Sequence, residues 1–301
     1  MKKVARSLLF AASLIFGTAC AQAVGAGAPG TPAFAVVDSV QMPAWIERDG
    51  VRQALEPGKI LQNRDHIITG ADARVMIQLA EGSAVKLGEN AQLDVNALGL
   101  RDKRVFTAAL DVARGAFRFT TGVFSARHKQ RAVNVRIATI TAGIRGTDLW
   151  GSSDAERDLI CLIEGKISVF HALDEARQVS EPLAIYQAAR GEAPALTGVA
   201  DARQLALWAA QTEIEPGAAY VRRGGKWKVE LATEESPDAA LALYDRARAA
   251  GFAVRIKPLP VAGGYHYAIR VTQLPSRVEA ELLASKLAGV LDLASPSVTR
   301  Y

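Results

Sequence analysis

The sequence predicts a multidomain protein in which an all-β sandwich or roll is followed by a smaller α+β domain. Two patterns in the chain lead to this prediction. Residues 34–185 consist of short runs in which apolar and polar side chains alternate, separated by turns rich in Gly, Asp and Asn. Residues 219–301 combine such runs with helical apolar spacing, in the order strand, helix, strand, strand, helix, strand.

The chain begins with a segment, residues 1–23, that has the pattern of a secretory signal peptide. Three basic residues precede an apolar run from Leu8 to Phe16, and two small-x-small cleavage points, ACA and AQA, follow it. The apolar run is too short to remain as a membrane-spanning helix, and no later stretch reaches the required length. We therefore expect an exported protein of the periplasm whose mature chain has no transmembrane segment.

Cysteine usage leaves one alternative open for this route. Cys20 follows Gly-Thr-Ala and offers a site for a lipid anchor, but Gly17 stands where such a signal normally has leucine. We therefore prefer cleavage without lipidation. If cleavage removes Cys20, then Cys161 remains as a small core side chain in the apolar run DLICLIEG, with no partner for an intramolecular disulfide.

Export also changes the meaning of the net charge. The full chain carries 36 basic and 31 acidic residues, a formal net charge of +5. Removal of residues 1–21 takes away three basic residues and no acidic residue, so the net charge falls to +2. A nearly balanced charge argues against a nucleic-acid partner, which needs a basic surface.

Residues 34–185 resemble the periplasmic FecR domain. The resemblance rests on blocks in family order: EPGKILQNRDHIITGADARVMIQLAEGSAVKLGENAQLDV, GAFRFTTG, TAGIRGTDLWG and CLIEGKISV. It implies a β-module that serves as a scaffold or binds another envelope protein. The best known relatives hold a sigma factor with a cytoplasmic segment. No such segment precedes the signal here, so sigma-factor regulation is not expected.

The most telling step of this resemblance is Arg145, Gly146 and Thr147. In a functional interpretation, Arg145 binds an anionic or sugar ligand. In a structural interpretation, its guanidinium donates to backbone carbonyls at a tight turn that Gly146 makes and Thr147 closes. We favour the structural interpretation, and we likewise expect Trp150 to pack in the core or at an edge.

Residues 186–218 are expected to link the two modules. Within them, DARQLALWAAQTEI predicts a short amphipathic helix with Leu205, Trp208 and Ala209 on one face. That face is expected to pack on a domain and not to bind a partner. The following EPGAAYVRRGGK is interpreted as a hinge.

The elements of the last part of the chain can be placed one by one. WKVEL is a first strand, and Ser236 followed by Pro237 begins a helix, since serine caps free N–H groups and proline suits the first helical position. Gly251 ends that helix because glycine accepts a left-handed conformation. FAVRIKPL and YHYAIRVTQL are the next strands. Ser276 and Glu279 have the spacing of a capping box for a second helix, and SPSVTR is the last strand.

Two helices on one face of a four-stranded sheet form the ferredoxin-like βαββαβ arrangement. The other sheet face stays bare and suits a flat, extended polymer. The first and third strands are neighbours in this topology, so Glu230 and Arg270 are expected side by side on the bare face. Lys228 and Ala268 are expected on the same face.

This last part resembles a SPOR domain, the module that binds glycan strands of bacterial peptidoglycan. The resemblance rests on WKVEL, on AALALYDRARAAGF, and on YAIRV followed by SRVEAELLASKLAG. It implies an envelope protein, with cell division as its setting, that binds glycan through Arg270 together with Glu230 and Tyr267. By alternation, Tyr267 can instead point into the core. Glu230 stands where the family usually has glutamine, which leaves open an envelope adaptor that has lost glycan binding.

No catalytic or metal-binding pattern accompanies these modules. The four histidines, His66, His128, His171 and His266, show none of the spacings that bind metal ions. No serine lies in a nucleophile elbow, and the acidic residues of GSSDAERD are interpreted as a solvated loop. The sequence therefore predicts a non-enzymatic binding protein that uses no metal or cofactor.

Overall fold

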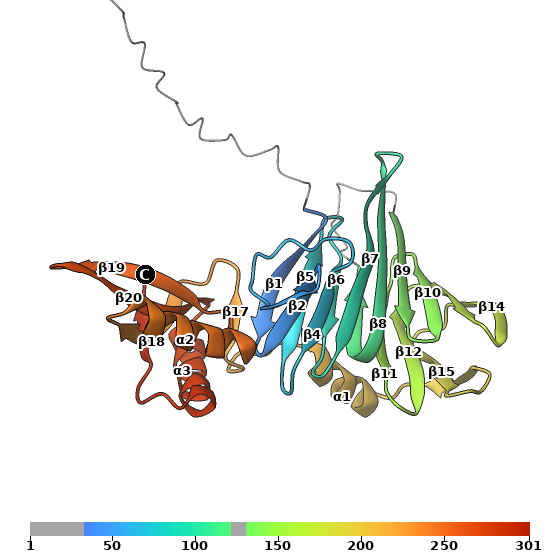
Figure 1. Cartoon of the computed structure of the whole chain (residues 1–301). Coiled ribbons are helices and arrows are strands. Elements are labelled where there is room, and N and C mark those ends of the chain that lie inside the picture. Colours follow the sequence, from blue (N-terminus) through green and yellow to red (C-terminus); the bar gives the residue numbers. More distant parts are fainter. Residues whose placement is uncertain (1–32, 122–130) are drawn as a thin grey trace, which may run out of the picture. The chain divides into compact units, whose positions relative to one another are not determined.

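The computed structural model describes residues 33–121 and 131–301. The expected signal peptide, with Cys20, and His128 lie outside these residues. Most of the described chain is β-structure in several sheets, and a small α+β domain follows at its C-terminal end (Figure 1). Across the described ranges, no helix is both long enough and apolar enough to cross a membrane.

The β-rich region contains two sheets whose neighbouring strands are mostly antiparallel. The first sheet consists of the second half of β8 (Val105–Thr120) with β1 (Ala35–Gln41), β5 (Arg74–Leu79), β6 (Ala84–Leu87), β11 (Asp148–Ser153), β12 (Arg157–Glu164), β15 (Ala184–Ala189), β16 (Ala195–Val199) and β17 (Tyr220–Arg222). The second sheet consists of the first half of β8 with β2 (Ala44–Arg48), β3 (Val51–Ala54), β4 (His66–Thr69), β7 (Gln92–Arg101), β9 (Arg131–Ile137), β10 (Ile140–Ile144), β13 (Ile167–His171) and β14 (Asp174–Val179).

Strand β8 (Val105–Thr120) joins the two sheets (Figure 1). Its first half pairs with β7 and β9, and its second half pairs with β6 and β11. The change occurs at Gly115, where φ is +88° and an added Cβ atom would come within 2.6 Å of Ala91. Glycine fits this bend because it accepts a positive φ and leaves room for the neighbouring backbone.

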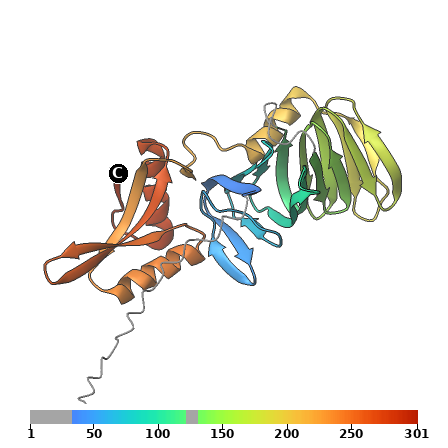
Figure 2. The same cartoon turned by 90° about the horizontal axis from the view of Figure 1, so that it is seen from above.

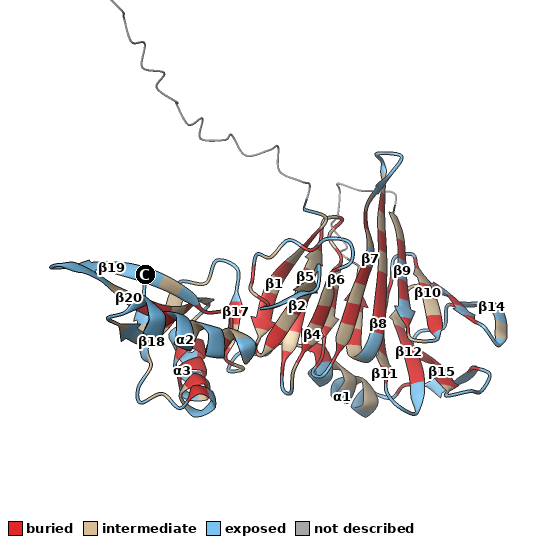
Figure 3. Ribbon diagram, in the orientation of Figure 1, coloured by how far each residue is buried: buried red, intermediate tan, exposed pale blue. Residues whose placement is uncertain are grey.

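Alternation along the strands builds the core. In β5, Val75, Ile77 and Leu79 are buried while the residues between them are half-buried, and Figure 3 shows the same banding on neighbouring strands. One large cluster of buried side chains takes residues from both sheets. Full burial of a side chain of this size contributes roughly 1.5–3 kcal/mol, so this core supplies most of the stabilising free energy.

The first sheet continues beyond residue 185, the boundary that the sequence pattern predicts. Strand β15 pairs with β12 and β16 pairs with β15, so β-structure continues to Val199. Helix α1 (Ala202–Thr212) follows and lies against this region (Figure 2). Its Leu205 and Trp208 pack on the outer face of the first sheet, which confirms the predicted amphipathic helix and its packing.

The C-terminal domain follows the predicted order of elements. Its elements are β18 (Trp227–Glu234), α2 (Pro237–Ala249), β19 (Arg255–Val261), β20 (Gly264–Leu274), α3 (Arg277–Leu291) and β21 (Ser297–Arg300). The four strands form an antiparallel sheet in the order β19-β20-β18-β21, which we name the C-terminal sheet. Both helices contribute buried side chains to the core, among them Ala240, Leu243, Ala280 and Leu283.

The helix ends show which capping predictions hold. Ser236 caps α2 with Pro237 at its start, and Gly251 follows the helix at φ +84°. Ser276 caps α3 by accepting a hydrogen bond from the Glu279 N–H at 3.2 Å. The Glu279 carboxylate, which was expected to complete a capping box, accepts from the N–H groups of Gly217 and Tyr220 at 2.5 and 3.3 Å. Glu279 therefore ties α3 to the segment that precedes the domain.

The segment interpreted as a hinge contains strand β17, which pairs with β1 in the first sheet. Further hydrogen bonds connect the C-terminal domain to the start of β2. Trp45 Nε1 donates to the Ala249 carbonyl at 3.2 Å, and Lys286 Nζ donates to the Met42 carbonyl at 2.7 Å. Residues 33–301 accordingly form one compact unit.

Candidate functional site

The C-terminal sheet has one face packed by helices and one face that the described helices leave uncovered. The register places on this bare face Lys228, Glu230 and Thr233 of β18, Arg255 and Lys257 of β19, Ala268 and Arg270 of β20, and Ser297 and Thr299 of β21. These side chains are exposed or half-buried, as the pale colour of β19 in Figure 3 illustrates, except that Ala268 is fully buried. Ala268 is small and lies between Thr233 and Lys257 in the register.

Glu230 and Arg270 lie opposite each other on β18 and β20, as the predicted strand order requires. The register continues to Arg255 on β19 and to Ser297 on β21, so four polar side chains form one row across the sheet. The Glu230 carboxylate accepts a hydrogen bond from Thr233 Oγ1 at 2.9 Å. It forms no ion pair with Arg270 among the residues that the structure describes.

Arg270 is the unpaired cation of this row. Within residues 33–121 and 131–301, its guanidinium has neither a hydrogen bond nor an ion pair. Arg255 beside it is bound to the Glu56 carboxylate of the β-rich region, at 2.7 Å. The Arg270 guanidinium therefore keeps its donors, which lie in a rigid plane and suit hydroxyl and amide oxygens of a ligand.

Tyr267 lies on the other side of the C-terminal sheet. It is half-buried and packs against the core cluster that the helices share. Three positions separate it from Arg270, so alternation sends the two side chains to opposite faces. The structure thus brings Glu230 and Arg270 together and keeps Tyr267 apart from them.

The Arg145–Thr147 step forms a bend between β10 of the second sheet and β11 of the first. Gly146 has φ +73°, and Thr147 Oγ1 donates to the Lys166 carbonyl at 3.0 Å. An added Cβ at Gly165 would lie 2.2 Å from the Gly146 oxygen, so the two segments cross closely. Arg145 is exposed, and the expected hydrogen bonds to backbone carbonyls are not formed with any described residue.

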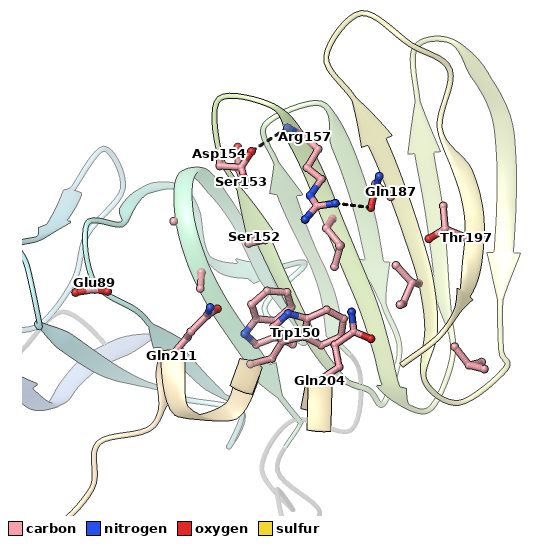
Figure 4. Close-up of a pocket in the computed structure, with 16 residues that line it drawn as sticks. Glu89, Trp150, Ser152, Ser153, Asp154, Arg157, Gln187, Thr197, Gln204 and Gln211 are labelled. Carbon is pink, nitrogen blue, oxygen red and sulfur yellow. Dashed lines mark hydrogen bonds between the residues drawn. The ribbon is translucent and has the colours of Figure 1, made fainter. Parts of the chain in front are cut away.

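A groove of about 640 Å³ lies on the outer face of the first sheet, beside α1 (Figure 4). We name it the α1 groove. Strands β8, β11, β12, β15 and β16 supply its floor, and α1 supplies one wall. The polar side chains that line it include Ser152, Arg157, Gln187, Thr197, Gln204 and Gln211. The sequence does not single out these residues, because they come from segments that meet only in the folded sheet.

Two tryptophans lie at the α1 end of this groove. Trp150 of β11 and Trp208 of α1 are stacked, with ring centroids 4.6 Å apart and planes at 9°. Trp150 is only 2% exposed, which confirms the expected core packing. Its Nε1 is buried and has no hydrogen-bond partner in the described part of the chain.

In the described ranges, His, Cys, Asp and Glu side chains could hold a metal ion, and the Cys thiol is also a nucleophile. No group of three His, Cys, Asp or Glu residues that could hold a metal ion occurs there. Cys161 is fully buried in β12, and burial raises the pKa of its thiol to about 11. A thiol with this pKa is a poor nucleophile at neutral pH because little thiolate is present.

Comparison with known families assigns two parts of the chain. The FecR protein family model matches residues 65–168, and the SPOR domain model matches residues 223–299. Both resemblances inferred from the sequence are thereby confirmed. The two families are binding or regulatory modules associated with the cell envelope, and a SPOR domain implies peptidoglycan binding. No curated protein matches this chain.

Two crystal structures of a proposed anti-sigma factor from Parabacteroides distasonis are similar to this chain. Their sequences are 13% and 12% identical to it. The matches cover 78% of this chain and 99% and 98% of the solved chains, with TM-scores of 0.39 and 0.40.

Proposed function

We propose that this protein is a non-catalytic protein of the periplasm that binds the glycan strands of peptidoglycan through the bare face of its C-terminal sheet. The observation that carries the proposal is Arg270. It has no partner among the described residues and lies in the middle of a polar row, inside the region that matches the SPOR domain model. Glu230 beside it supplies hydrogen-bond acceptors for sugar hydroxyls, and Tyr267 supports the strand from the core side.

The geometry of the bare face suits an extended polymer. We take the domain to have the ferredoxin-like arrangement, in which such a face stays open. Neighbouring strands lie about 4.8 Å apart, so the row from Arg255 to Ser297 spans roughly 14 Å across four strands. A row of polar side chains of this length can contact several sugar units of a linear chain.

We assign the β-rich region a supporting role. It serves as a scaffold for the C-terminal domain or as a binding module for a second envelope protein. Support comes from the hydrogen bonds that Trp45 and Lys286 make across the two regions. Cell division is the setting that the SPOR resemblance suggests for this activity.

A second candidate function rests on Glu230. A carboxylate only accepts hydrogen bonds when ionised, whereas a glutamine both donates and accepts. If glycan recognition needs the amide donor, the domain no longer binds glycan and the chain acts as an adaptor between envelope proteins.

Co-sedimentation of the full chain with purified peptidoglycan sacculi separates the two functions. In the leading proposal, the wild-type protein pellets with sacculi at low salt and Glu230→Gln changes its affinity little. In the adaptor proposal, the wild-type protein stays in the supernatant and Glu230→Gln creates binding.

A further inference from the structure

We propose that the α1 groove is a second binding site, for an uncharged oligosaccharide. The site lies in the β-rich region and shares no residue with the bare face of the C-terminal sheet. It therefore goes beyond the proposed function, and it can be tested independently of glycan binding by the bare face.

The floor is a part of the sheet that α1 does not cover. The register aligns Ser152, Leu159 and Gln187 on three adjacent strands. The next row includes Trp150 and Cys161. These two side chains belong to a small hydrophobic cluster on which Leu205 and Trp208 of α1 pack. The helix thus covers the row of Trp150 and Cys161. In the neighbouring row Leu159 is buried, and Ser152 and Gln187 on either side of it stay half-buried along the groove (Figure 4).

This neighbouring row and the helix wall carry hydrogen-bonding groups without partners. Among the described residues, the side chains of Ser152, Thr197, Gln204 and Gln211 make no hydrogen bond. These groups are hydroxyls and amides, which both donate and accept.

The charged side chains of the groove are already engaged. Asp154 accepts from the backbone N–H of Arg157 at 2.9 Å, and Arg157 Nη1 donates to Gln187 Oε1 at 3.4 Å. Glu89 accepts from the Asp72 N–H at 2.7 Å. Because these charged groups are already hydrogen-bonded, the groove has little positive charge left to attract a polyanion. Its amide-rich lining disfavours a lipid chain, which would leave the amides without hydrogen bonds.

The indole of Trp208 gives the groove an apolar end. Trp208 is half-buried and lines the groove together with Trp150. Sugar rings present a polar rim of hydroxyls and an apolar C–H face, which indole surfaces pack against. Neutral amides along the walls and the Trp208 indole at one end match the chemistry of a neutral sugar chain.

Isothermal calorimetry of the full chain with chitotetraose, cellotetraose and maltotetraose tests this site. We expect saturable binding of at least one of the three. Binding of chitotetraose alone would indicate an N-acetylated glycan, as in cell walls, and binding of the others a different polysaccharide. Gln187→Ala and Gln204→Ala should each weaken the affinity several-fold, up to about tenfold, because each removes one hydrogen-bonding partner.

Two control variants locate the binding. Gln178→Ala removes an exposed amide on β14, outside the groove, and should leave the affinity unchanged. Arg270→Ala should also leave it unchanged, although the same variant is expected to lower binding to sacculi. The proposal is wrong if none of the three tetrasaccharides binds at millimolar concentration. It is also wrong if a tetra-alanine peptide, which carries no sugar, binds instead of them. It is also wrong if sugar binding responds to Arg270→Ala and not to Gln204→Ala.

Discussion

The Asp65 side chain has no exposed surface, and its charge is balanced inside the β-rich region. Arg48 donates to both carboxylate oxygens, at 2.6 and 2.7 Å, and the Gln62 N–H donates to one of them at 2.7 Å. This arrangement compensates the cost of burying a charge, which is several kcal/mol for an unpaired ion. The hydrogen bond to Asp65 also raises the pKa of Arg48, so the guanidinium keeps its charge.

Arg48→Ala should therefore destabilise the protein strongly. We expect a loss of about 3 kcal/mol in the free energy of unfolding, because Asp65 is left buried without its counter-ion. Urea denaturation measures this change. Arg101→Ala, at the exposed end of β7, is the matched control and should stay within about 0.5 kcal/mol of the wild type. Equal midpoints for both variants would contradict the account of Asp65.

Cys161 gives a second prediction at the residue scale. Its thiol is fully buried and burial raises its pKa to about 11, so almost no thiolate is available at pH 8. In a chain that begins at Val24, a thiol reagent should label Cys161 slowly in buffer and rapidly in concentrated urea. Fast labelling of the folded protein would show that β12 opens to solvent.

Single residues also mark where reasoning from sequence stops. The caps at Ser236 and Ser276 were predictable because a cap depends on neighbours within three residues. Glu279 was misassigned because its partners, Gly217 and Tyr220, lie about 60 positions away in the chain. Local spacing predicts local hydrogen bonds, but a buried carboxylate takes the donors that the tertiary fold brings to it.

Strand β8 is the element on which the β-rich region depends. It passes from the second sheet to the first at Gly115, which has a positive φ and lies against Ala91. A strand that serves two sheets must bend and keep both sets of backbone hydrogen bonds. Glycine at the bend makes this possible because no Cβ obstructs the neighbouring segment.

Gly115→Ala should disrupt this bend. The new Cβ would meet the Ala91 backbone at 2.6 Å, and the positive φ adds strain, so we expect a loss of at least about 2 kcal/mol. Gly99→Ala on β7 is the matched control, since nothing lies within 4 Å of its added Cβ. Thermal unfolding should show a clear drop in Tm for the first variant and little change for the second. Similar Tm values would mean that β8 is not constrained at Gly115.

Element types in this chain follow from local patterns, whereas sheet membership does not. Alternation in VMIQL and the helical spacing of ALALYDRA are local, and both elements form as predicted. The short strand β17 was interpreted as part of a hinge, because YVR has no pattern of its own and is a strand only through its pairing with β1. The predicted end of the β-rich region came too early because β16 is exposed along its whole length and therefore shows no alternation of buried and exposed side chains.

At the scale of the whole molecule, the C-terminal domain is fastened to the β-rich region. Gly251 lies where the two meet: an added Cβ would come within 2.7 Å of Pro43 and of the Trp45 ring. The Ala44 N–H donates to the Gly251 carbonyl at 3.2 Å. The contact at Trp45 therefore requires glycine for space as well as for its positive φ.

Gly251→Ala should loosen this contact. It combines the positive-φ cost with a clash, which adds about 1–3 kcal/mol when a tight interface is overpacked. Gly263→Ala is the matched control, because Gly263 also has a positive φ, +91°, but nothing lies within 4 Å of its added Cβ. Limited proteolysis should cut Gly251→Ala faster than Gly263→Ala in the segment between α1 and β18. Equal cleavage would show that the two regions do not rely on this contact.

The two candidate sites differ in how far the sequence predicts them. The row on the bare face depends on strand order alone, so the sequence by itself predicts that Glu230 and Arg270 are neighbours. That Arg270 has no partner in the described part of the chain follows only from the structure, where Glu230 accepts from Thr233. The α1 groove joins five strands and a helix, and no local pattern marks its residues.

The most direct test of glycan binding by the bare face compares Arg270→Ala with Arg277→Ala. Arg277 lies on α3, where it forms an exposed pair with Glu281, and serves as a control for loss of charge. The fraction of full-length protein that co-sediments with purified sacculi is measured over a range of sacculus concentrations. We expect Arg277→Ala to match the wild type and Arg270→Ala to bind about tenfold or more weakly, since charged hydrogen bonds contribute about 1.5–3 kcal/mol. Equal binding by both variants, or none by the wild type, would contradict the account.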